Sequence, residues 1–230
     1  MKPISPFGLP IGISVSIWSL IGLLRLILKY LPHKLPRFGW RKKLWPSDFA
    51  VLLPAYNEEV VFRQSIQALK QMLDKKQIYV VSDGSNDKTY RRAQMEGCHV
   101  SRLIPGRGKG RALVYLLARY HLFDRYKLIF IVDADTRIDK TCVKRALPLF
   151  KDPDIGVCFA SSRIRWPQHF MPQLKYYFIA YRERLNRLLQ YFLIYGQTWK
   201  YTNVNYVIPG FATIYRSDVL KQLEIDTPGL

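Results

Sequence analysis

The chain has 230 residues, which is enough for one globular domain of ordinary size and an appendage. Its apolar content of 49% excludes a disordered chain, and three scattered cysteines (Cys98, Cys142 and Cys158) exclude a small disulfide scaffold and suit a reducing compartment. The 36 lysines and arginines outnumber the 17 acids, and the resulting formal charge of +19 leaves three kinds of partner open: nucleic acid, a membrane surface and a phosphorylated substrate.

Residues 1–48 differ in composition from the rest, and we expect them to form a membrane-associated unit with a basic linker. Ile11–Leu24 carries no charge, and the apolar character of Leu9–Leu31 continues long enough to span a bilayer. Basic residues follow this stretch, so the positive-inside rule predicts a single anchor in the inner cell membrane, with the main domain in the cytoplasm. A helix lying in the membrane interface stays open because Arg25 and Lys29 are four residues apart, and so does a soluble segment.

From residue 49 onward, short apolar runs alternate with helical patterns. This alternation, with short connections, predicts a mainly parallel α/β sheet. Ligands of such sheets bind beyond the carboxyl ends of the strands. We therefore expect one crevice to collect the three polar clusters that directly follow predicted strands: Tyr56–Glu58, Asp83–Asp87 and Asp133–Asp135. The strands are expected at Phe49–Leu53, Ile78–Val81, Leu128–Val132 and Ile155–Ala160.

A basic and aromatic stretch follows the last of these strands. The spacing of Leu174, Tyr177, Tyr181 and Leu185 predicts a long helix. Two interpretations stay open for it: a helix at a membrane interface, or an ordinary core-facing helix with a solvated basic side.

Two aspartates separated by one residue, Asp133 and Asp135, are the first candidates for a metal site. Carboxylate oxygens suit Mg²⁺ or Mn²⁺, and such a metal typically binds the phosphates of a substrate. The pattern arises readily by chance, and Asp152-Pro153-Asp154 repeats it where we expect a solvated turn. The first pair instead follows a predicted buried strand, and a pair that merely caps the strand end is the alternative.

Two further candidates lie in polar loops. Asp83 is suited to accept hydrogen bonds from a base or a sugar, or else to form the turn itself. Lys109 lies in Pro105–Arg111, where three glycines let the backbone approach a phosphate and a helix begins. This loop does not match the Walker A pattern, and a plain solvated loop is the alternative for Lys109.

Five segments, in order, resemble the motifs of family 2 glycosyltransferases, the inverting group that includes cellulose, chitin and hyaluronan synthases. Val51–Glu58 and Val80–Thr89 resemble the first two motifs. Gly108–Leu113 looks like the lysine loop, Val132–Thr136 like the D-x-D element, and Pro209–Arg216 like the glycine-containing segment on the acceptor side.

This resemblance implies a GT-A fold over residues 49–230, with a mixed, mainly parallel sheet flanked by helices. It implies a metal-dependent enzyme that transfers a sugar from a nucleotide-sugar donor, commonly UDP-linked. With the anchor predicted from residues 1–48, we expect a membrane-anchored enzyme whose acceptor is a polysaccharide, a glycolipid or another lipid-linked glycan. No signature of a nucleic-acid-binding domain is present, so we expect no nucleic-acid partner. The resemblance also implies a role for each candidate residue. It assigns the nucleoside to Pro54, Ala55, Tyr56, Glu58 and Asp83, and support of the nucleotide to Lys109. It places Asp133 at the ribose or the metal, and it has Asp135 bind Mn²⁺ or Mg²⁺ at the diphosphate.

The family's general base, an acid in a T-E-D-like motif after Pro209–Arg216, has no counterpart in this sequence, and neither has the Q-x-x-R-W motif of the synthases. We expect the base to lie beyond Leu230. Without a base the acceptor hydroxyl is not deprotonated in the usual way. The chain is therefore interpreted either as a truncated piece of a synthase or as a non-catalytic protein that binds nucleotide sugars.

Overall fold

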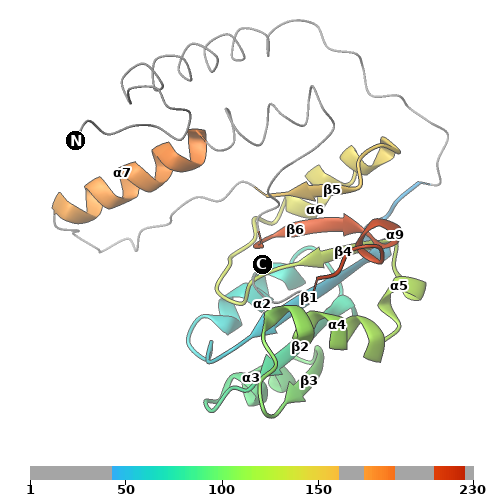
Figure 1. Cartoon of the computed structure of the whole chain (residues 1–230), viewed down its shortest axis with the longest axis horizontal. Helices are drawn as coiled ribbons and strands as arrows, with labels where there is room; N and C mark the ends of the chain where they lie inside the picture. Colours follow the sequence, from blue (N-terminus) through green and yellow to red (C-terminus); the bar gives the residue numbers. More distant parts are fainter. Residues whose placement is uncertain (1–42, 161–173, 190–209, 226–230) are drawn as a thin grey trace, which may run out of the picture. The chain divides into compact units, whose positions relative to one another are not determined.

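The computed structural model describes residues 43–160, 174–189 and 210–225. The chain divides into two compact units, and we describe each by itself. One comprises Met1–Leu35 and Ser161–Ile208, and the other comprises Pro36–Ala160 and Pro209–Leu230. The second, here called the sheet unit, contains every strand of the described residues (Figure 1).

The described strands form one mixed sheet in the order β3-β2-β1-β4-β6-β5. The first four strands in this order run parallel, whereas β6 lies antiparallel between β4 and β5. This arrangement confirms the predicted mixed, mainly parallel sheet. The strands are β1 (Phe49–Ala55), β2 (Ile78–Asp83), β3 (His99–Leu103), β4 (Leu128–Ile131), β5 (Val157–Phe159) and β6 (Thr213–Arg216).

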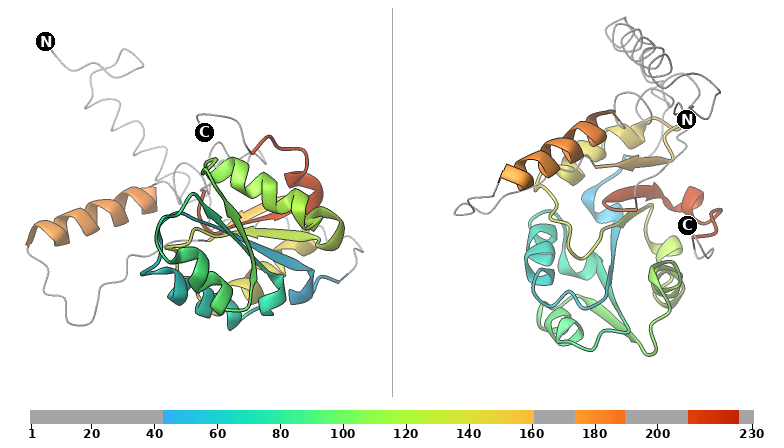
Figure 2. Two further views of the ribbon diagram at one scale, coloured as in Figure 1. Left: turned by 90° about the horizontal axis from the view of Figure 1, so that it is seen from below. Right: turned by 60° about the vertical axis from the view of Figure 1, so that its left-hand side comes forward.

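Helices cover both faces of the sheet (Figure 2). Alternate side chains of β1 divide between two cores: Val51 packs with Phe62 of α2, and Leu52 packs with Leu116 of α4. The central strand is therefore apolar on both faces, which explains why Phe49–Leu53 reads as a continuous apolar run. The first face carries α2 (Phe62–Lys70), α3 (Thr89–Met95), α6 (Cys142–Ala146) and the short turn η3 (Leu149–Lys151), and the second carries α4 (Lys109–Arg119), α5 (Leu122–Arg125) and α9 (Ser217–Leu220). Two further short turns, η1 (Pro46–Asp48) and η2 (Lys75–Gln77), precede β1 and β2.

The other unit contains α7 (Leu174–Leu189), which confirms the predicted helix. The side chains of Leu174, Tyr177, Tyr181 and Leu185 are exposed. At 16 residues, α7 is about 24 Å long, shorter than the hydrocarbon thickness of a bilayer, and its sequence includes charged residues.

Within residues 43–160, 174–189 and 210–225, no helix combines the length and the apolar character that crossing a membrane requires. This finding contradicts the predicted location at the inner membrane through a single N-terminal anchor, and we withdraw that prediction. The segment Leu9–Leu31, on which it was based, lies outside the described residues.

An aromatic cluster on the α4 side of the sheet includes a histidine. The His99 ring stacks on Tyr79, with ring centroids 4.8 Å apart and an interplanar angle of 9°, and Tyr120 tilts against both rings. Burial lowers the pKa of His99 below its ordinary value of 6.5, and the positive charge of Arg125 lowers it further.

We expect this histidine to make the folded state less stable in mild acid. Because the folded-state pKa is the lower one, the unfolded chain takes up the proton first, and the free energy of unfolding falls as the pH drops below about 6.5. Urea denaturation of the wild type and His99→Phe, between about pH 7.5 and about pH 5.5, measures the effect, since Phe keeps a stacked ring without titrating. The wild type should lose more stability than the variant, and equal losses would contradict the assignment.

Candidate active site

The parallel strands end along one edge of the sheet, and the three predicted polar clusters start there. Ala55 at the end of β1 is in register with Ser82 of β2. On the other side of β1, the N–H of Val132, just after β4, donates to the carbonyl of Leu52 at 3.0 Å. The ends of β1, β2 and β4 are therefore neighbours, as expected for a ligand site of an open α/β sheet.

The loop after β1 is tied to the loop after β2 at Asn57. Its N–H donates to the hydroxyl of buried Ser85 at 3.2 Å, and its side-chain carbonyl accepts the N–H of Asn86 at 3.0 Å. The Asn57 backbone has a φ of 53°, a left-handed conformation that asparagine tolerates better than most residues. These bonds hold the two loops in one arrangement at the rim of the site.

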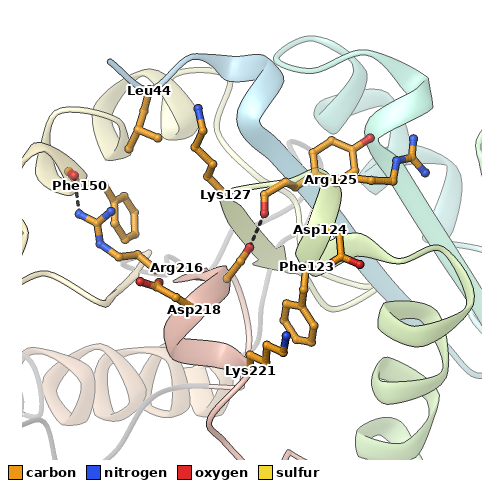
Figure 3. A pocket seen from close by; sticks show the side chains of 11 residues that line it. Leu44, Phe123, Asp124, Arg125, Lys127, Phe150, Arg216, Asp218 and Lys221 are labelled. Atoms are coloured by element: carbon orange, nitrogen blue, oxygen red, sulfur yellow. Dashed lines mark hydrogen bonds between the residues drawn. The ribbon is translucent and has the colours of Figure 1, made fainter. Parts of the chain in front are cut away.

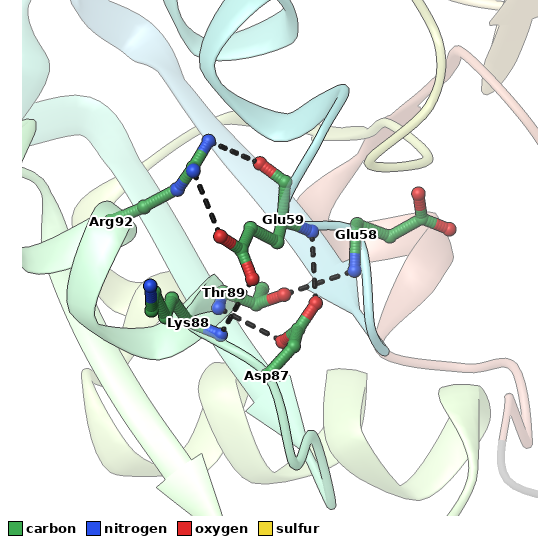
Figure 4. A network of polar contacts seen from close by, with 6 residues as sticks. All are labelled: Glu58, Glu59, Asp87, Lys88, Thr89 and Arg92. Atoms are coloured by element: carbon green, nitrogen blue, oxygen red, sulfur yellow. Dashed lines mark hydrogen bonds and ion pairs between the residues drawn. The ribbon is translucent and has the colours of Figure 1, made fainter.

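A second set of bonds extends this connection to the start of α3 (Figure 4). The N–H of Glu58 donates to the Thr89 hydroxyl at 2.9 Å, and the N–H of Glu59 donates to Asp87 at 3.1 Å. Arg92 donates to both the carbonyl and the carboxylate of Glu59, each at 2.8 Å. Burial raises the pKa of Asp87, but hydrogen bonds from Thr89 and the Glu59 amide outweigh burial and lower it below its ordinary value.

The Glu58 side chain points away from this network (Figure 4). Burial raises the pKa of its carboxyl group, and the negative charges of Asp135, Asp87 and Asp133 raise it further. Glu58 thus supplies its amide to the loop scaffold, while its carboxylate is within electrostatic reach of the candidate metal pair.

Asp83, at the end of β2, organises the glycine-containing loop that precedes α4. Its buried carboxylate accepts the N–H of Arg107 at 2.7 Å and the N–H of Gly108 at 2.8 Å. The loop also lies against the strand end, because a Cβ atom on Gly84 would come within 2.9 Å of the backbone of Gly106. Two backbone amides of the loop that we expected to approach a phosphate are therefore bonded to Asp83.

Lys109, the first residue of α4, connects this loop to two other segments. Its ammonium group forms an ion pair with the carboxylate of Asp133, just beyond β4. The same group donates to the carbonyl of Gly210, which lies before β6, at 2.9 Å. The alternative interpretation, a plain solvated loop, does not describe Lys109. This residue connects the start of α4 to the segments that contain Asp133 and Gly210.

Asp133 and Asp135 offer part of a metal site. Asp135 is exposed and accepts a hydrogen bond from the hydroxyl of Thr136 at 3.3 Å, whereas Ala134 between the two aspartates is buried. The described residues include no group of three or more His, Cys, Asp or Glu side chains that could hold a metal. Mg²⁺ is usually held by one or two carboxylates together with substrate phosphates, so the two aspartates fit a metal that arrives with its diphosphate. The second D-x-D pattern behaves as predicted: Asp152 accepts the N–H of Asp154 within a turn.

The remaining predicted residues lie at the same edge. Pro54 and Ala55 are the last residues of β1, and Tyr56, directly after them, is exposed. A Cβ atom on Gly84 would lie 4.0 Å from Cε2 of Tyr56, which places that ring beside the end of β2. The sequence did not indicate the Gly210 carbonyl as a partner of Lys109, because no side-chain pattern marks a backbone acceptor.

A separate cavity of about 610 Å³ lies at the opposite end of the sheet (Figure 3). Lys127, on its wall, directly precedes β4, whereas Asp133 follows that strand. Two of its cations are engaged: Lys127 pairs with Asp48 at 2.7 Å, and Arg216 donates to the carbonyls of Phe150, Ile155 and Asp152 at 2.6, 2.7 and 2.9 Å. We therefore place the candidate active site at the edge where the glycine loop and the aspartates meet.

These bonds make Arg216 a structural residue, although its segment resembled the acceptor side of a transferase. We expect Arg216→Met to lower the free energy of unfolding by about 3 kcal/mol, because three carbonyls lose a charged donor. Lys221→Met is the matched control, since Lys221 lines the same cavity but is exposed, and it should change stability by less than about 0.5 kcal/mol. Urea denaturation measures both, and similar losses in the two variants would show that the bonds of Arg216 contribute little.

Comparison with known proteins gives the family. A family model described as glycosyl transferase family 2 matches residues 50–223. An uncharacterized protein of Methanocaldococcus jannaschii is 36% identical over 113 residues, which cover 48% of this chain and 46% of the relative. A mannosyltransferase from Pyrobaculum calidifontis, solved in complex with GDP-Man and Mn²⁺, is 16% identical with a TM-score of 0.58, and the match covers 90% of this chain and 55% of that one. Glucosyl-3-phosphoglycerate synthase from Mycobacterium tuberculosis, solved with UDP, is 19% identical with a TM-score of 0.49, covering 80% and 66% of the two chains.

The chain thus spans about half the length of the first two of these relatives. The likeness to the Pyrobaculum structure shows the shared GT-A-like fold. The family model covers most of the sequence, including every motif that carried the resemblance. The chain belongs to glycosyltransferase family 2.

Proposed function

We propose that residues 49–230 form a transferase domain that binds a nucleotide-sugar donor at the ends of β1, β2 and β4 and transfers the sugar to an acceptor hydroxyl. The observation that carries this proposal is the junction at Lys109, whose ammonium group contacts Asp133 and the carbonyl of Gly210 close to exposed Asp135. A cation beside two carboxylates at a strand end suits a metal-bound diphosphate, because it adds positive charge where negative charge develops.

The nucleoside is assigned to the rim formed by the loops after β1 and β2. Tyr56 offers an exposed ring for a base, while Pro54 and Ala55 shape the adjoining wall. The oxygens of Asp83 and Glu58 are hydrogen-bond acceptors for the base or the ribose. The bonds between the two loops fix this rim before a ligand arrives, which reduces the entropic cost of binding.

The proposed metal is Mn²⁺ or Mg²⁺, held by Asp135 and Asp133. When bound, such a metal would neutralise part of the charge on the leaving diphosphate. The Pyrobaculum mannosyltransferase was solved with GDP-Man and Mn²⁺, which agrees with the choice of donor class and metal.

The chain's own residues have a defined part in the transfer. The acceptor oxygen forms a bond to the anomeric carbon from the face opposite the diphosphate, and the bond from that carbon to the phosphate oxygen breaks. The configuration at the anomeric carbon is therefore inverted. In this proposal the ammonium group of Lys109, which contacts Asp133, stabilises the charge that builds on the departing diphosphate. The acceptor hydroxyl, proposed to belong to a glycan or a lipid-linked glycan, gives its proton to a base.

Release of nucleoside diphosphate from GDP-Man, UDP-Glc and UDP-GlcNAc, with Mn²⁺ and with EDTA, tests this proposal. We expect Mn²⁺-dependent release from at least one donor. No release, together with no binding of GDP or UDP, would overturn the proposal. Binding without release would support the non-catalytic donor-binding protein instead.

A further inference from the structure

The ammonium group of Lys109 has two partners, and one of them belongs to the candidate metal pair. It forms an ion pair with Oδ1 of Asp133, and it donates to the carbonyl of Gly210 at 2.9 Å. An ammonium group has three N–H donors, so these two bonds leave one donor for a further acceptor. The chain thus places a positive charge of its own on the carboxylate that is proposed to hold a metal.

This ion pair lies within reach of solvent. The side chain of Lys109 is 44% exposed, and that of Asp133 is 33% exposed. Ion pairs between partly exposed side chains contribute little net free energy, because water and salt screen the two charges. The pair can therefore open at little cost when a stronger partner for either charge arrives.

A metal ion and a diphosphate are such partners, and each acts on a different half of the pair. A divalent cation that binds alone is repelled by the ammonium group and must share the Asp133 carboxylate with it. A nucleoside diphosphate brings negative oxygens that accept hydrogen bonds from the ammonium group, and hydrogen bonds between charged groups are strong. When the Lys109 side chain turns to the diphosphate, the carboxylate is released to the metal.

We propose that Lys109 is an internal counter-ion of Asp133, which lowers the affinity of the site for a metal alone and yields the carboxylate when the diphosphate of the donor arrives. This inference rests on the proposed function, because it assumes that a metal-bound diphosphate occupies the site. It gives Lys109 a second task, which is to couple the binding of the metal to that of the donor. By reciprocity, the nucleotide and the metal raise each other's affinity by the same factor.

Two other roles of Lys109 make different predictions. If the lysine only binds the diphosphate, its replacement leaves the affinity for the metal alone unchanged. If the lysine instead orients Asp133 for the metal, its replacement lowers this affinity, because the carboxylate loses its support. Of the three roles, the competing charge is the one whose removal raises the affinity for the metal, so the sign of the effect decides between them.

Titration of the full chain with Mn²⁺, followed by electron paramagnetic resonance of the unbound ion, measures this sign. Without nucleotide, we expect Lys109→Met to bind Mn²⁺ about tenfold more tightly than the wild type. Lys109→Arg keeps the positive charge and should bind Mn²⁺ like the wild type. With Mn²⁺ present, calorimetry should show that Lys109→Met binds UDP or GDP about tenfold more weakly, because the diphosphate loses a charged donor.

Lys127→Met is the matched control. Lys127 also forms an ion pair with an aspartate, Asp48, at 2.7 Å, and its side chain is 52% exposed, but it lies at the opposite end of the sheet. Its replacement should leave both affinities within about twofold of the wild type. If circular dichroism shows that Lys109→Met does not fold, Lys109→Gln supplies the same comparison, because it removes the charge and keeps a donor for the carbonyl of Gly210.

An affinity for Mn²⁺ alone that is unchanged or lower in the neutral variant, or too weak to measure in every protein, would overturn the counter-ion role and leave the proposed function standing. Equal tightening in Lys109→Arg and Lys109→Met would also overturn it, because the charge would then not be the cause. A wild type that binds neither UDP nor GDP with Mn²⁺ would overturn the proposed function itself, and this inference with it.

Discussion

Replacement of Asp135 by Asn is expected to reduce Mn²⁺-dependent release of nucleoside diphosphate by about 10²- to 10³-fold. The substitution keeps the size of the side chain and removes the negative charge that a divalent cation requires. Asp135 is exposed, and its carboxylate accepts a hydrogen bond from the hydroxyl of its neighbour Thr136, so the fold should be little affected. Initial rates at saturating donor and varied Mn²⁺ measure the loss.

Asp154→Asn is the matched control for this variant. Asp154 is the last residue of the other D-x-D pattern, is exposed, and lies in a turn between η3 and β5. Its loss should leave the rate within about twofold of the wild type, because surface substitutions away from a site have small effects. Equal rates for Asp135→Asn and the wild type would remove Asp135 from the metal site.

A second large effect is expected at Gly84, where the loop after β2 meets the glycine loop. Gly84 has a φ of 74°, and an added Cβ atom would come within 2.9 Å of both Cα and N of Gly106. Gly84→Ala thus combines the cost of a left-handed alanine with a clash against backbone, and it should lower the free energy of unfolding by about 3 kcal/mol. The clash also displaces Gly106, so nucleotide binding should weaken.

Gly97→Ala isolates the backbone part of this effect. Gly97 has nearly the same φ, 72°, but an added Cβ atom would meet only the side chain of Lys75, at 3.5 Å or more. The free energy of unfolding of Gly97→Ala should therefore fall by about 1 kcal/mol, and this variant should keep its nucleotide binding. Urea denaturation and calorimetry compare the two variants, and similar losses of stability would show that the approach of Gly84 to Gly106 is not tight.

The interior strands were predictable from sequence because burial on both faces leaves an unbroken apolar run. Leu128–Ile131 and Ile78–Val81 are fully or almost fully buried, and both were expected as strands. β3 (His99–Leu103) was missed because it is an edge strand in which three of the five residues are polar and Arg102 is exposed. β6 was missed because its antiparallel place between β4 and β5 depends on partners far away in the sequence.

The location of the candidate site was predictable from the sequence, but the contacts among its residues were not. Strand ends in a parallel sheet meet at one edge, so the convergence of the polar clusters follows from topology. The bonds of Asp83 to backbone amides do not follow, because an aspartate in a turn cluster is equally suited to bind a ligand or the chain itself. Lys109 illustrates the same limit, since one of its partners, Gly210, is 101 residues away.

The most direct test of the account is to map where a nucleoside diphosphate binds. Hydrogen exchange with and without Mn²⁺ and GDP or UDP should show protection at Tyr56–Glu58, at Asp83–Asn86 and at Asp133–Asp135, the loops that follow β1, β2 and β4. Protection at Phe123–Lys127 and Arg216–Lys221 instead, around the cavity at the opposite end of the sheet, would contradict the placement of the donor site.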